Sequence, residues 1–394
     1  MELSVNSEAN LEKTHLTLGY MPLTDCLPLI TALENGYFAE QGLEVELRQE
    51  VSWANIRDKV IVGHLDGAQM LAPMIMATTL GLSCLQKPMI TAFSLGLNGN
   101  ALTLSVPLIE AINRYDQLNS GEALAKVVQD RKTQGKAALV IASVFPYSCH
   151  TLQLKYWLAA AGINPDTDIQ LVGLPPSQMV DHLALGHIDG FIAGAPWNSV
   201  SISTGIGNCL TTSYSIWQNS PEKVFGVTAD WAEENPNTHI AVIKALYKAC
   251  AWLEDHRAEA ASLLSSYVGI ESSTLLPALS GNFAFGKTTS AVAMPDMLVF
   301  NRYLANYPFH CHAAFLIEQM ARWQDLPAGV DSKALAAQCY RPDIYQQALP
   351  DSPIPNEPRL SLGEHQGNWQ LNTQQGSIDM GGDALCDGQV FVSS

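Results

Sequence analysis

A five-residue phrase, Gly-His-(Leu or Ile)-Asp-Gly, occurs twice in this chain, at residues 63–67 and 186–190. Each copy follows a segment with helical spacing of apolar residues and precedes a segment typical of a buried strand. The first glycine suits the left-handed conformation that ends a helix, and the aspartate favours the turn that follows. Neither His64 nor His187 has further ligands at a spacing useful for a metal. The repeat therefore predicts two similar α/β units rather than two metal or catalytic sites.

Strand-like and helix-like segments alternate through most of the chain. In the first half, a helix is predicted over residues 29–38 and a strand over 43–47. The second half repeats this order, with a buried strand over 136–144, a helix over 150–163 and a strand over 169–175. This alternation predicts an α/β layered fold with a largely parallel sheet.

The last third of the chain changes character. Apolar residues recur at helical spacing over residues 241–268, 295–307 and 312–323, which predicts helices there. After Pro350 the sequence is rich in Pro, Gly, Gln, Ser and Asn and poor in periodic apolar residues. Such a composition predicts a disordered tail over residues 351–394.

Composition excludes several classes of function. The chain has 394 residues, of which 47% are hydrophobic, and this is enough for two domains of ordinary size. Its formal net charge of −17 repels the phosphates of nucleic acids and of anionic lipids. No window approaches the ~20 apolar residues that a membrane span needs. Direct binding to nucleic acid or to a membrane is therefore not expected.

The N-terminus and the cysteines predict a compartment. Glu2, Glu8 and Glu12 take the place of the basic start and the apolar run of an export signal. The eight cysteines are scattered without a C-x-x-C pair, which suits free thiols in a reducing environment. With Met1 as the native start, we expect a cytoplasmic protein.

Candidate binding residues follow predicted strands, where open α/β sheets place their ligands. They are Trp53, Gln69, Asn100, His150, the main chain at Gly194, and Lys223. Together they offer indole, amide, imidazole, backbone and ammonium donors, with few carboxylates expected nearby. A helix that begins near His150 adds free N–H groups and a favourable dipole. This set predicts a small anion held by donors beside an aromatic wall.

No catalytic motif emerges from the sequence. It has no G-x-S-x-G, no phosphate-binding glycine loop and no H-E-x-x-H. Cys149 and His150 are neighbours in sequence, which is no sign of a dyad, because dyad partners meet through space. The run His310-Cys311-His312 precedes an apolar helix, where a structural or capping role is expected. We therefore expect a binding protein that has neither a metal nor a cofactor.

Several motifs together resemble one family. They are SWANIRDKV, GHLDGAQMLAPM, LNGNALTLS, HTLQLKYWLAAAGINPD, LPPSQMV, GAPWN and SPEKVFG. From about Thr14 to Leu349, the chain resembles the nitrate/bicarbonate-binding branch of the periplasmic solute-binding proteins. This resemblance implies a two-lobed Venus-flytrap fold with two crossovers, closing on one oxyanion. It implies a first lobe at 14–103, a second at 104–215, and a return to the first lobe with C-terminal helices at 216–350.

The resemblance also assigns roles to the candidate residues. Trp53 resembles the tryptophan that walls the nitrate site, and His150 resembles the histidine of that site. Gly194 corresponds to a main-chain contact, and Lys223 to the lysine that supplies the positive charge. Asn100 takes the place of a glutamine, so a bridging water or a shifted anion is expected there. Bicarbonate binders have a carboxylate where Lys223 lies, so the resemblance implies nitrate or nitrite.

Without an export signal, the chain most resembles the cytoplasmic nitrate-sensor branch, the NasS type. That likeness implies a partner, an RNA-binding antiterminator of the ANTAR class (NasT type), released when the anion binds. One alternative is a nitrate-binding protein associated with an ABC transporter that lacks its export signal. Another is an enzyme similar to the thiamine-pyrimidine synthases. Their cysteine-rich motif has no counterpart here, where the closest cysteines, Cys311 and Cys339, are 28 positions apart.

Overall fold

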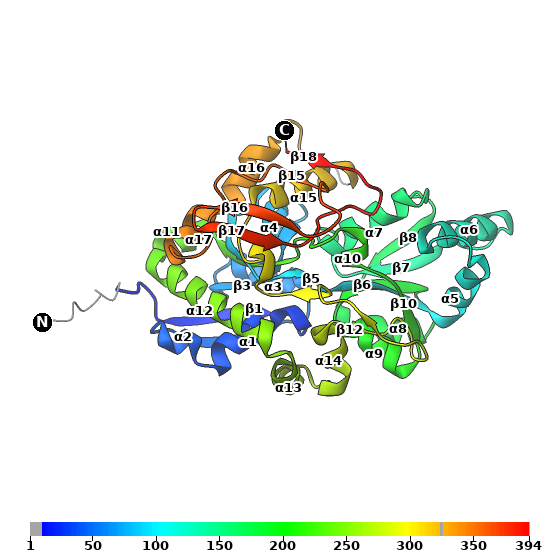
Figure 1. The fold of residues 1–394 in the computed structure, drawn as a ribbon, viewed down its shortest axis with the longest axis horizontal. Coiled ribbons are helices and arrows are strands. Elements are labelled where there is room, and N and C mark those ends of the chain that lie inside the picture. Colours follow the sequence, from blue (N-terminus) through cyan, green and yellow to red (C-terminus); the bar gives the residue numbers. More distant parts are fainter. Residues whose placement is uncertain (1–9, 324–325, 394) are drawn as a thin grey trace, which may run out of the picture.

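The computed structural model describes residues 10–323 and 326–393, and these form two α/β lobes that lie side by side (Figure 1). The sheet of lobe 1 has the order β2 (Glu44–Gln49), β1 (His15–Tyr20), β3 (Gly67–Leu71), β11 (Lys223–Thr228), β4 (Met89–Ser94). The sheet of lobe 2 has the order β10 (Gly207–Thr212), β6 (Asn100–Ser105), β9 (Gly190–Gly194), β7 (Leu139–Ser143), β8 (Ile169–Gly173). The predicted α/β architecture is confirmed.

Both sheets are mixed rather than largely parallel. In lobe 1, β1 runs parallel to β2 and β3, whereas β11 runs antiparallel to β3 and β4. In lobe 2, β7 runs parallel to β8 and β9, whereas β6 runs antiparallel to β9 and β10. The reversed strands, β6 and β11, are those that enter a lobe from the other one. The two crossings therefore account for the departure from a parallel sheet.

The crossings themselves are short. The chain leaves lobe 1 through β5 (Leu97–Asn98), which pairs antiparallel with β14 (Leu298–Val299), and continues directly into β6. It returns through α10 (Ser213–Ile216) and residues 217–222 into β11. Both crossings thus deliver a strand whose first residue lies at the boundary between the lobes. The domain limits inferred from sequence stay predictions.

Helices cover the sheets on both sides (Figure 1). Those within residues 10–204 are α1 (Leu27–Glu34), α2 (Tyr37–Glu40), α3 (Trp53–Ile61), α4 (Ala72–Thr79), α5 (Val106–Ile112), α6 (Ser120–Thr133), α7 (Cys149–Ala160), α8 (Met179–Ala184) and α9 (Trp197–Thr204). After α10 follow α11 (Ala229–Glu234), α12 (Pro236–Asp255), α13 (Arg257–Val268), α14 (Ser272–Ser280), α15 (His310–Trp323), α16 (Ser332–Cys339) and α17 (Pro342–Ala348). Their apolar faces build one large core shared with the sheets.

The repeated phrase has the structural role predicted for it. Gly63 follows α3 with φ of +74°, and Gly186 follows α8 with φ of +69°, a region that other residues adopt at a cost. The side chains of His64 and His187 are exposed. In each copy the second glycine enters a strand, β3 or β9, next to closely packed neighbours.

The two aspartates of the repeat make equivalent bonds. Asp66 Oδ2 accepts a hydrogen bond from the backbone N–H of Thr17 in β1, at 2.9 Å. Asp189 Oδ2 accepts one from the backbone N–H of Val140 in β7, at 2.8 Å. Each aspartate thus ties a helix-to-strand turn to the neighbouring parallel strand. The repeat records two lobes that are built alike.

The predicted helix at 295–307 is wrong. Residues there form β14 and the short 3₁₀ turn Arg302–Leu304, in which Tyr303 has φ of +62°. The carboxylate of Glu254 accepts backbone N–H bonds from Phe300 and Asn301, both at 2.7 Å. These tertiary partners replace the bonds that a helix would have formed within itself. Pairing with β5 fixes the remaining extended stretch.

The tail predicted to be disordered is ordered as far as residue 393. In it β15 (Ser361–Leu362) pairs with β18 (Phe391–Val392), and β16 (Trp369–Thr373) pairs with β17 (Gly376–Met380). Its few aromatic and apolar side chains find partners on the rest of the molecule. Phe391 lies against Phe315 of α15, with ring centroids 5.2 Å apart. Composition missed this order because the tail has no core of its own and uses the core of lobe 1.

The tail also bonds to the returning crossover. The backbone N–H of Gln218 donates to Ala384 O at 3.0 Å, and that of Cys386 donates to Ile216 O at 2.9 Å. Tyr156 of α7, in lobe 2, donates its hydroxyl to Asp387 Oδ1 at 2.7 Å. The tail therefore contacts both lobes and one of the two connections between them.

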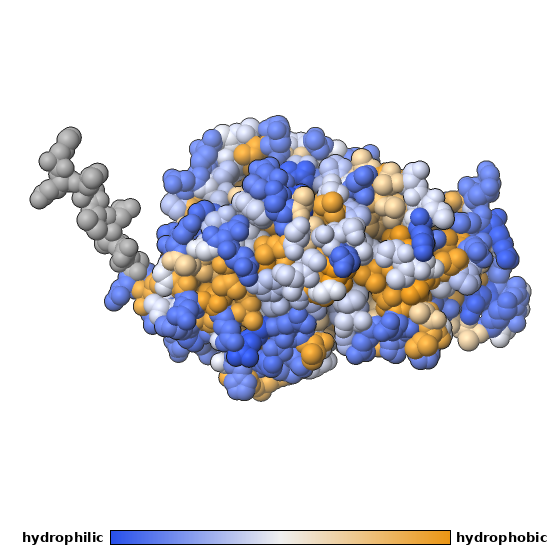
Figure 2. Space-filling view, turned by 90° about the horizontal axis from the view of Figure 1, so that it is seen from below, coloured by the Kyte–Doolittle hydropathy of each residue, from blue (hydrophilic) through white to orange (hydrophobic). Residues whose placement is uncertain are grey.

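The molecular surface gives one further fact. Figure 2, which views the molecule from below, shows apolar residues gathered along the middle of that face and mostly hydrophilic residues at both ends.

Within the described residues, no helix has the length and apolar character needed to cross a membrane. Glu2 and Glu8, two of the three glutamates in the export-signal argument, lie outside the described part of the chain.

Replacing Gly190 with alanine tests the close packing at the second repeat. A Cβ there would lie 2.3 Å from Leu104 Cδ2 and 2.9 Å from Thr103 O. Such overpacking costs about 1–3 kcal/mol of folding free energy, measurable by urea denaturation. Gly173→Ala is the matched control, because a Cβ at Gly173 meets nothing within 4 Å. Equal stability of the two variants would contradict this account.

Truncation after Pro350 tests the tail. Removal of residues 351–394 uncovers Phe315 and leaves Gln218 and Tyr156 without their partners in the tail. We expect a clearly lower Tm, because aromatic burial and several buried bonds are lost together. A control truncation before Asn10 removes residues outside the described structure. An unchanged Tm for the long truncation would show that the tail adds nothing to stability.

Candidate functional site

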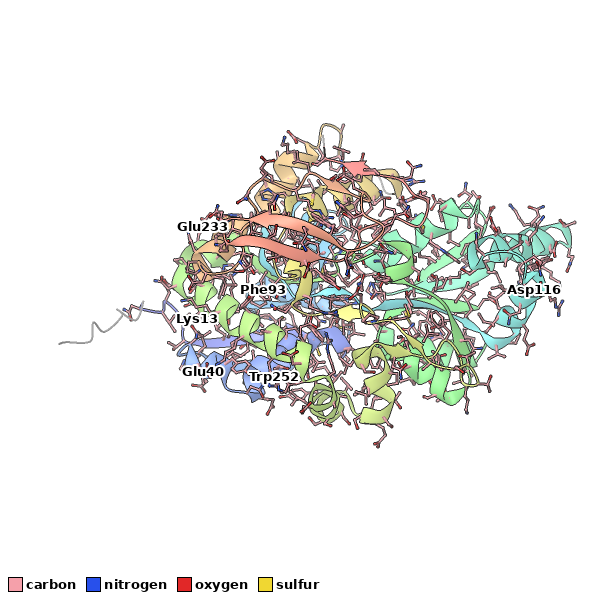
Figure 3. All side chains as sticks on the ribbon, viewed as in Figure 1. Lys13, Glu40, Phe93, Asp116, Glu233 and Trp252 are labelled. Atoms are coloured by element: carbon pink, nitrogen blue, oxygen red, sulfur yellow. The ribbon has the colours of Figure 1, made fainter. Side chains whose placement is uncertain are left out.

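Five of the six candidate residues meet at the boundary between the lobes. Figure 3 shows Phe93, on β4, inside lobe 1 and Asp116 at the far tip of lobe 2, and β6 lies between them (Figure 1). Asn100 is the first residue of β6, and Lys223 is the first residue of β11. The two crossings thus bring an amide and an ammonium group to one place.

Lys223 is the centre of this cluster. Its side chain is 1% exposed, and its Nζ lies 2.7 Å from Asp25 Oδ2 and 2.7 Å from Glu222 Oε1. Burial alone would lower the pKa of Lys223, but the two carboxylates outweigh burial and hold that pKa above the ordinary lysine value. The ammonium group therefore stays charged. Its Nζ also lies 5.6 Å from the ring centroid of Trp53, within the range of a cation–π contact.

Trp53 is placed by the start of α3. Ser52 caps this helix, with its hydroxyl oxygen accepting the backbone N–H of Asn55 at 3.2 Å. Trp53 is therefore the first helical residue, and its side chain is buried against the cluster. The first turn of α3 presents free backbone N–H groups on this side of lobe 1.

Lobe 2 contributes His150 and Asn100. His150 is the second residue of α7, which Ser148 caps by accepting the backbone N–H of Thr151 at 3.1 Å. His150 Nδ1 lies 3.7 Å from Glu222 Oε1, too far for a hydrogen bond. Burial and the nearby Lys223 hold the pKa of His150 well below its usual range, so the imidazole is neutral. Asn100 donates from Nδ2 to Glu222 Oε2 and, at 3.3 Å, to Gln153 Oε1.

Several buried polar atoms of the cluster have no hydrogen-bond partner among the described residues. They are Trp53 Nε1, Asn100 Oδ1 and both ring nitrogens of His150. Buried polar groups are almost always paired, because an unpaired one costs about 1–3 kcal/mol. These indole and imidazole nitrogens belong to the same cluster as one buried ammonium. The arrangement is suited to a small polar molecule that accepts hydrogen bonds and carries negative charge.

Gly194 contributes main chain beside the cluster, whereas Gln69 contacts Asp25. Gly194 pairs with Asn100 in the β6–β9 ladder, and a Cβ there would lie 3.4 Å from Asn100 Oδ1 and 3.5 Å from Asp25 Oδ2. Because glycine has no side chain, the backbone of Gly194 lies directly beside Asn100 and Asp25. Gln69 accepts the backbone N–H of Met21 at 2.8 Å and donates to Asp25. Gln69 thus holds Asp25 in place, and the structure gives it no contact with Lys223.

The expectation of few carboxylates nearby is wrong. Asp25 and Glu222 both contact Lys223, and both were missed in the sequence. Asp25 follows β1 in the 3₁₀ turn Thr24–Cys26, so its position at a strand end was a usable signal. Glu222 immediately precedes β11, and neighbouring residues within a strand point to opposite faces. The two side chains converge because Glu222 lies just before the strand.

Two motifs from the sequence remain, the run His310-Cys311-His312 and the pair Cys149-His150. Among the described residues, no group of three or more His, Cys, Asp or Glu side chains is placed to hold a metal ion. His310 Nε2 bonds to Tyr340 O at 2.9 Å, and Cys311 and His312 are buried, in line with the structural role predicted for this run. Burial raises the pKa of Cys149, so the thiol next to His150 stays protonated.

Comparisons with known proteins agree with this architecture. Residues 9–266 match the model of the NMT1-like family. The chain is 38% identical over 345 residues (86% of this chain, 50% of the relative) to the nitrate import ATP-binding protein NrtC of Synechocystis sp.. It is 41% identical over 324 residues (80% and 47%) to the bicarbonate transport ATP-binding protein CmpC of the same organism. It therefore spans about half the length of these two relatives.

A full-length relative and a solved structure extend the likeness. The nitrate/nitrite binding protein NrtA of Nostoc sp. is 30% identical over 355 residues, or 88% of this chain and 79% of that one. The crystal structure of the periplasmic nitrate-binding protein NrtA of Synechocystis superposes with a TM-score of 0.85 at 26% identity, covering 98% and 97%. The chain thus belongs to the NMT1-like family and has the two-lobed fold of the periplasmic solute-binding proteins.

Proposed function

We propose that this chain binds nitrate or nitrite between its lobes. The observation that carries the proposal is the buried ammonium of Lys223 beside the unpaired nitrogens of Trp53 and His150. An anion there would accept charge-assisted and neutral hydrogen bonds in a site shielded from water. The N-terminal ends of α3 and α7 add favourable dipoles, because both helices begin at residues of the cluster. NrtA relatives whose names state nitrate or nitrite binding support this ligand class.

The choice of nitrate over bicarbonate rests on residue 223. Nitrate and bicarbonate are both flat and singly charged, so the buried face of Trp53 and one ammonium group suit either anion. Lysine at position 223 departs from the carboxylate expected of a bicarbonate site. Relatives with bicarbonate in their name are as similar as those with nitrate, so bicarbonate is the competing ligand to be measured.

We further propose that the bound anion regulates a partner protein. Anion contacts from both lobes favour a closed form, and the closed form would present a different surface to the partner. The partner in this proposal is an ANTAR-class antiterminator of the NasT type, which would contact RNA itself. The net charge of −17 supports this division of labour, since the chain repels RNA phosphates.

A second candidate is an anion-binding domain that serves nitrate import. One observation favours it: the chain is 38% identical to NrtC, whose name states nitrate import, and the match covers 50% of that protein. In this case the partner is the import machinery rather than an antiterminator. The anion site would be the same in both candidates, so only the partner separates them.

Replacing Lys223 with methionine tests the anion site. Calorimetric titration with nitrate, nitrite and bicarbonate should show saturable nitrate or nitrite binding to the wild type. The variant should lose binding by about 30-fold or more, because breaking a buried charge pair costs about 2–5 kcal/mol. Lys248→Met, at a half-exposed ion pair with Glu40, is the matched control and should bind normally.

Because Lys223→Met leaves Asp25 and Glu222 without their cation, its folding must be checked by thermal unfolding. Trp53→Phe provides a milder second variant, which keeps an aromatic wall and removes the indole N–H. It should weaken nitrate binding without loss of the fold. Heat from bicarbonate alone would overturn the choice of ligand.

Release of an antiterminator tests the regulatory proposal. The purified chain should capture an ANTAR-class protein without nitrate and release it when nitrate saturates the site. Lys223→Met should hold the partner at every nitrate concentration, since it cannot bind the anion. Failure of the wild type to capture the partner in either condition would favour the import-associated candidate.

A further inference from the structure

An incoming anion would add negative charge to a group of side chains that is already negative when both carboxylates are ionised. Lys223 supplies one positive charge, and Asp25 and Glu222 each have an oxygen 2.7 Å from its Nζ. With both carboxylates ionised, the buried group already has one net negative charge. Nitrate or nitrite would raise that to two in a site with almost no exposure to water. Like charges at such distances repel strongly where water cannot screen them.

Glu222 lies beside the donors that an anion would use. Its Oε1 lies 2.7 Å from Lys223 Nζ and 3.7 Å from His150 Nδ1. Its Oε2 accepts the amide of Asn100. The carboxylate of Glu222 therefore engages donors from both lobes, as the oxygens of a bound oxyanion would. An incoming anion would therefore share these donors with Glu222.

Building on the proposed function, we propose that nitrate or nitrite binds this site together with one proton, which Glu222 takes up. The carboxylate of Glu222 becomes a carboxylic acid, and its O–H donates to the anion. The sum of the step is one carboxylate, one proton and one anion giving one carboxyl group and one bound anion. The net charge of the buried group stays at minus one throughout. Glu222 thereby sets the affinity for the anion according to pH.

The other groups around Glu222 keep their charge state. Lys223, with its pKa held high, stays protonated, and His150, with its pKa held well below the usual range, stays neutral. Burial raises the pKa values of Cys149 and Tyr340, so both stay protonated. Burial also raises the pKa of Glu222, against the opposing effect of Lys223, and this moves its titration toward neutral pH.

Asp25 has a different role from Glu222. Its polar partners belong to lobe 1, where Gln69 donates to its Oδ1 and Lys223 contacts its Oδ2. Glu222, by contrast, contacts Asn100 and approaches His150, both in lobe 2. Asp25 remains the fixed counter-ion of Lys223, and Glu222 is the carboxylate that responds to the anion.

The pH dependence follows from linkage. A proton taken up on binding means that the pKa of Glu222 is higher in the complex than in the free protein. Affinity is then constant below the free-protein pKa, where Glu222 is already protonated. Above that pKa, affinity falls by up to tenfold per pH unit, until the pKa of the complex is reached. Acidic conditions therefore favour binding.

Calorimetry on the full chain tests this inference. Nitrate is titrated at pH 6, 7 and 8, at each pH in two buffers that contain no oxyanion and differ in ionisation enthalpy. We expect uptake of up to one proton per nitrate at the higher pH values and weaker binding as pH rises. This buffer comparison uses the wild type alone, so it does not depend on any variant that fails to fold.

Glu222→Gln is the decisive variant, because glutamine mimics the protonated acid in shape and charge. It should bind nitrate more tightly than the wild type at pH 8, with no proton uptake and a flat pH profile. Glu40→Gln, at a half-exposed ion pair with Lys248, is the matched control and should keep the proton uptake. A gain in affinity is a result that loss of a merely structural residue would not give.

Distinct results overturn the inference and the proposed function. A wild type that binds nitrate with no proton uptake, and with equal affinity from pH 6 to 8, overturns the inference and leaves the anion site intact. Proton uptake that persists in Glu222→Gln shows that another group takes up the proton and also overturns it. No heat from nitrate or nitrite at any of these pH values overturns the proposed function and the inference together.

Discussion

The structure depends on one buried cation and on the groups that surround it. An ammonium group with 1% exposure is tolerated only where nearby carboxylates repay its lost hydration, and Asp25 and Glu222 do so. Glu222 reaches across to Asn100, so the neutralisation of a lobe 1 lysine is shared with lobe 2. The same contacts that make the lysine tolerable therefore hold the two lobes together. The neutralisation of this one buried charge therefore matters both for the fold and for the site.

Local chemistry made much of the fold predictable. The doubled phrase forecast two equivalent lobes because glycine and aspartate act on their own turn, within a few residues. Trp53, Asn100, His150 and Lys223 could be grouped because strand ends share one edge of a sheet. Their individual roles as ligands stay predictions. Asp25 and Glu222 escaped notice because acids are an unexpected choice for an anion site when each residue is considered alone.

What could not be predicted depends on distant partners. The stretch at 295–307 has helical periodicity, yet Glu254 and β5 satisfy its backbone in an extended form. The tail has too few apolar residues to build a core, yet those few bury themselves on α15 and on the return crossover. In both cases a segment of weak intrinsic preference takes its structure from a surface that lies far away in sequence.

The near-complete burial of Lys223, Asn100 and His150 has a kinetic consequence. A small ion cannot pass through packed side chains, so in the proposed site an anion would enter or leave only while the lobes are apart. The rate of departure is then set by how often the protein opens rather than by the strength of the ion's own bonds. Chemically different anions would leave at similar rates, and the occupied state would persist through brief dips in supply. The occupancy of the proposed site would then follow the anion concentration averaged over the interval between two openings of the lobes.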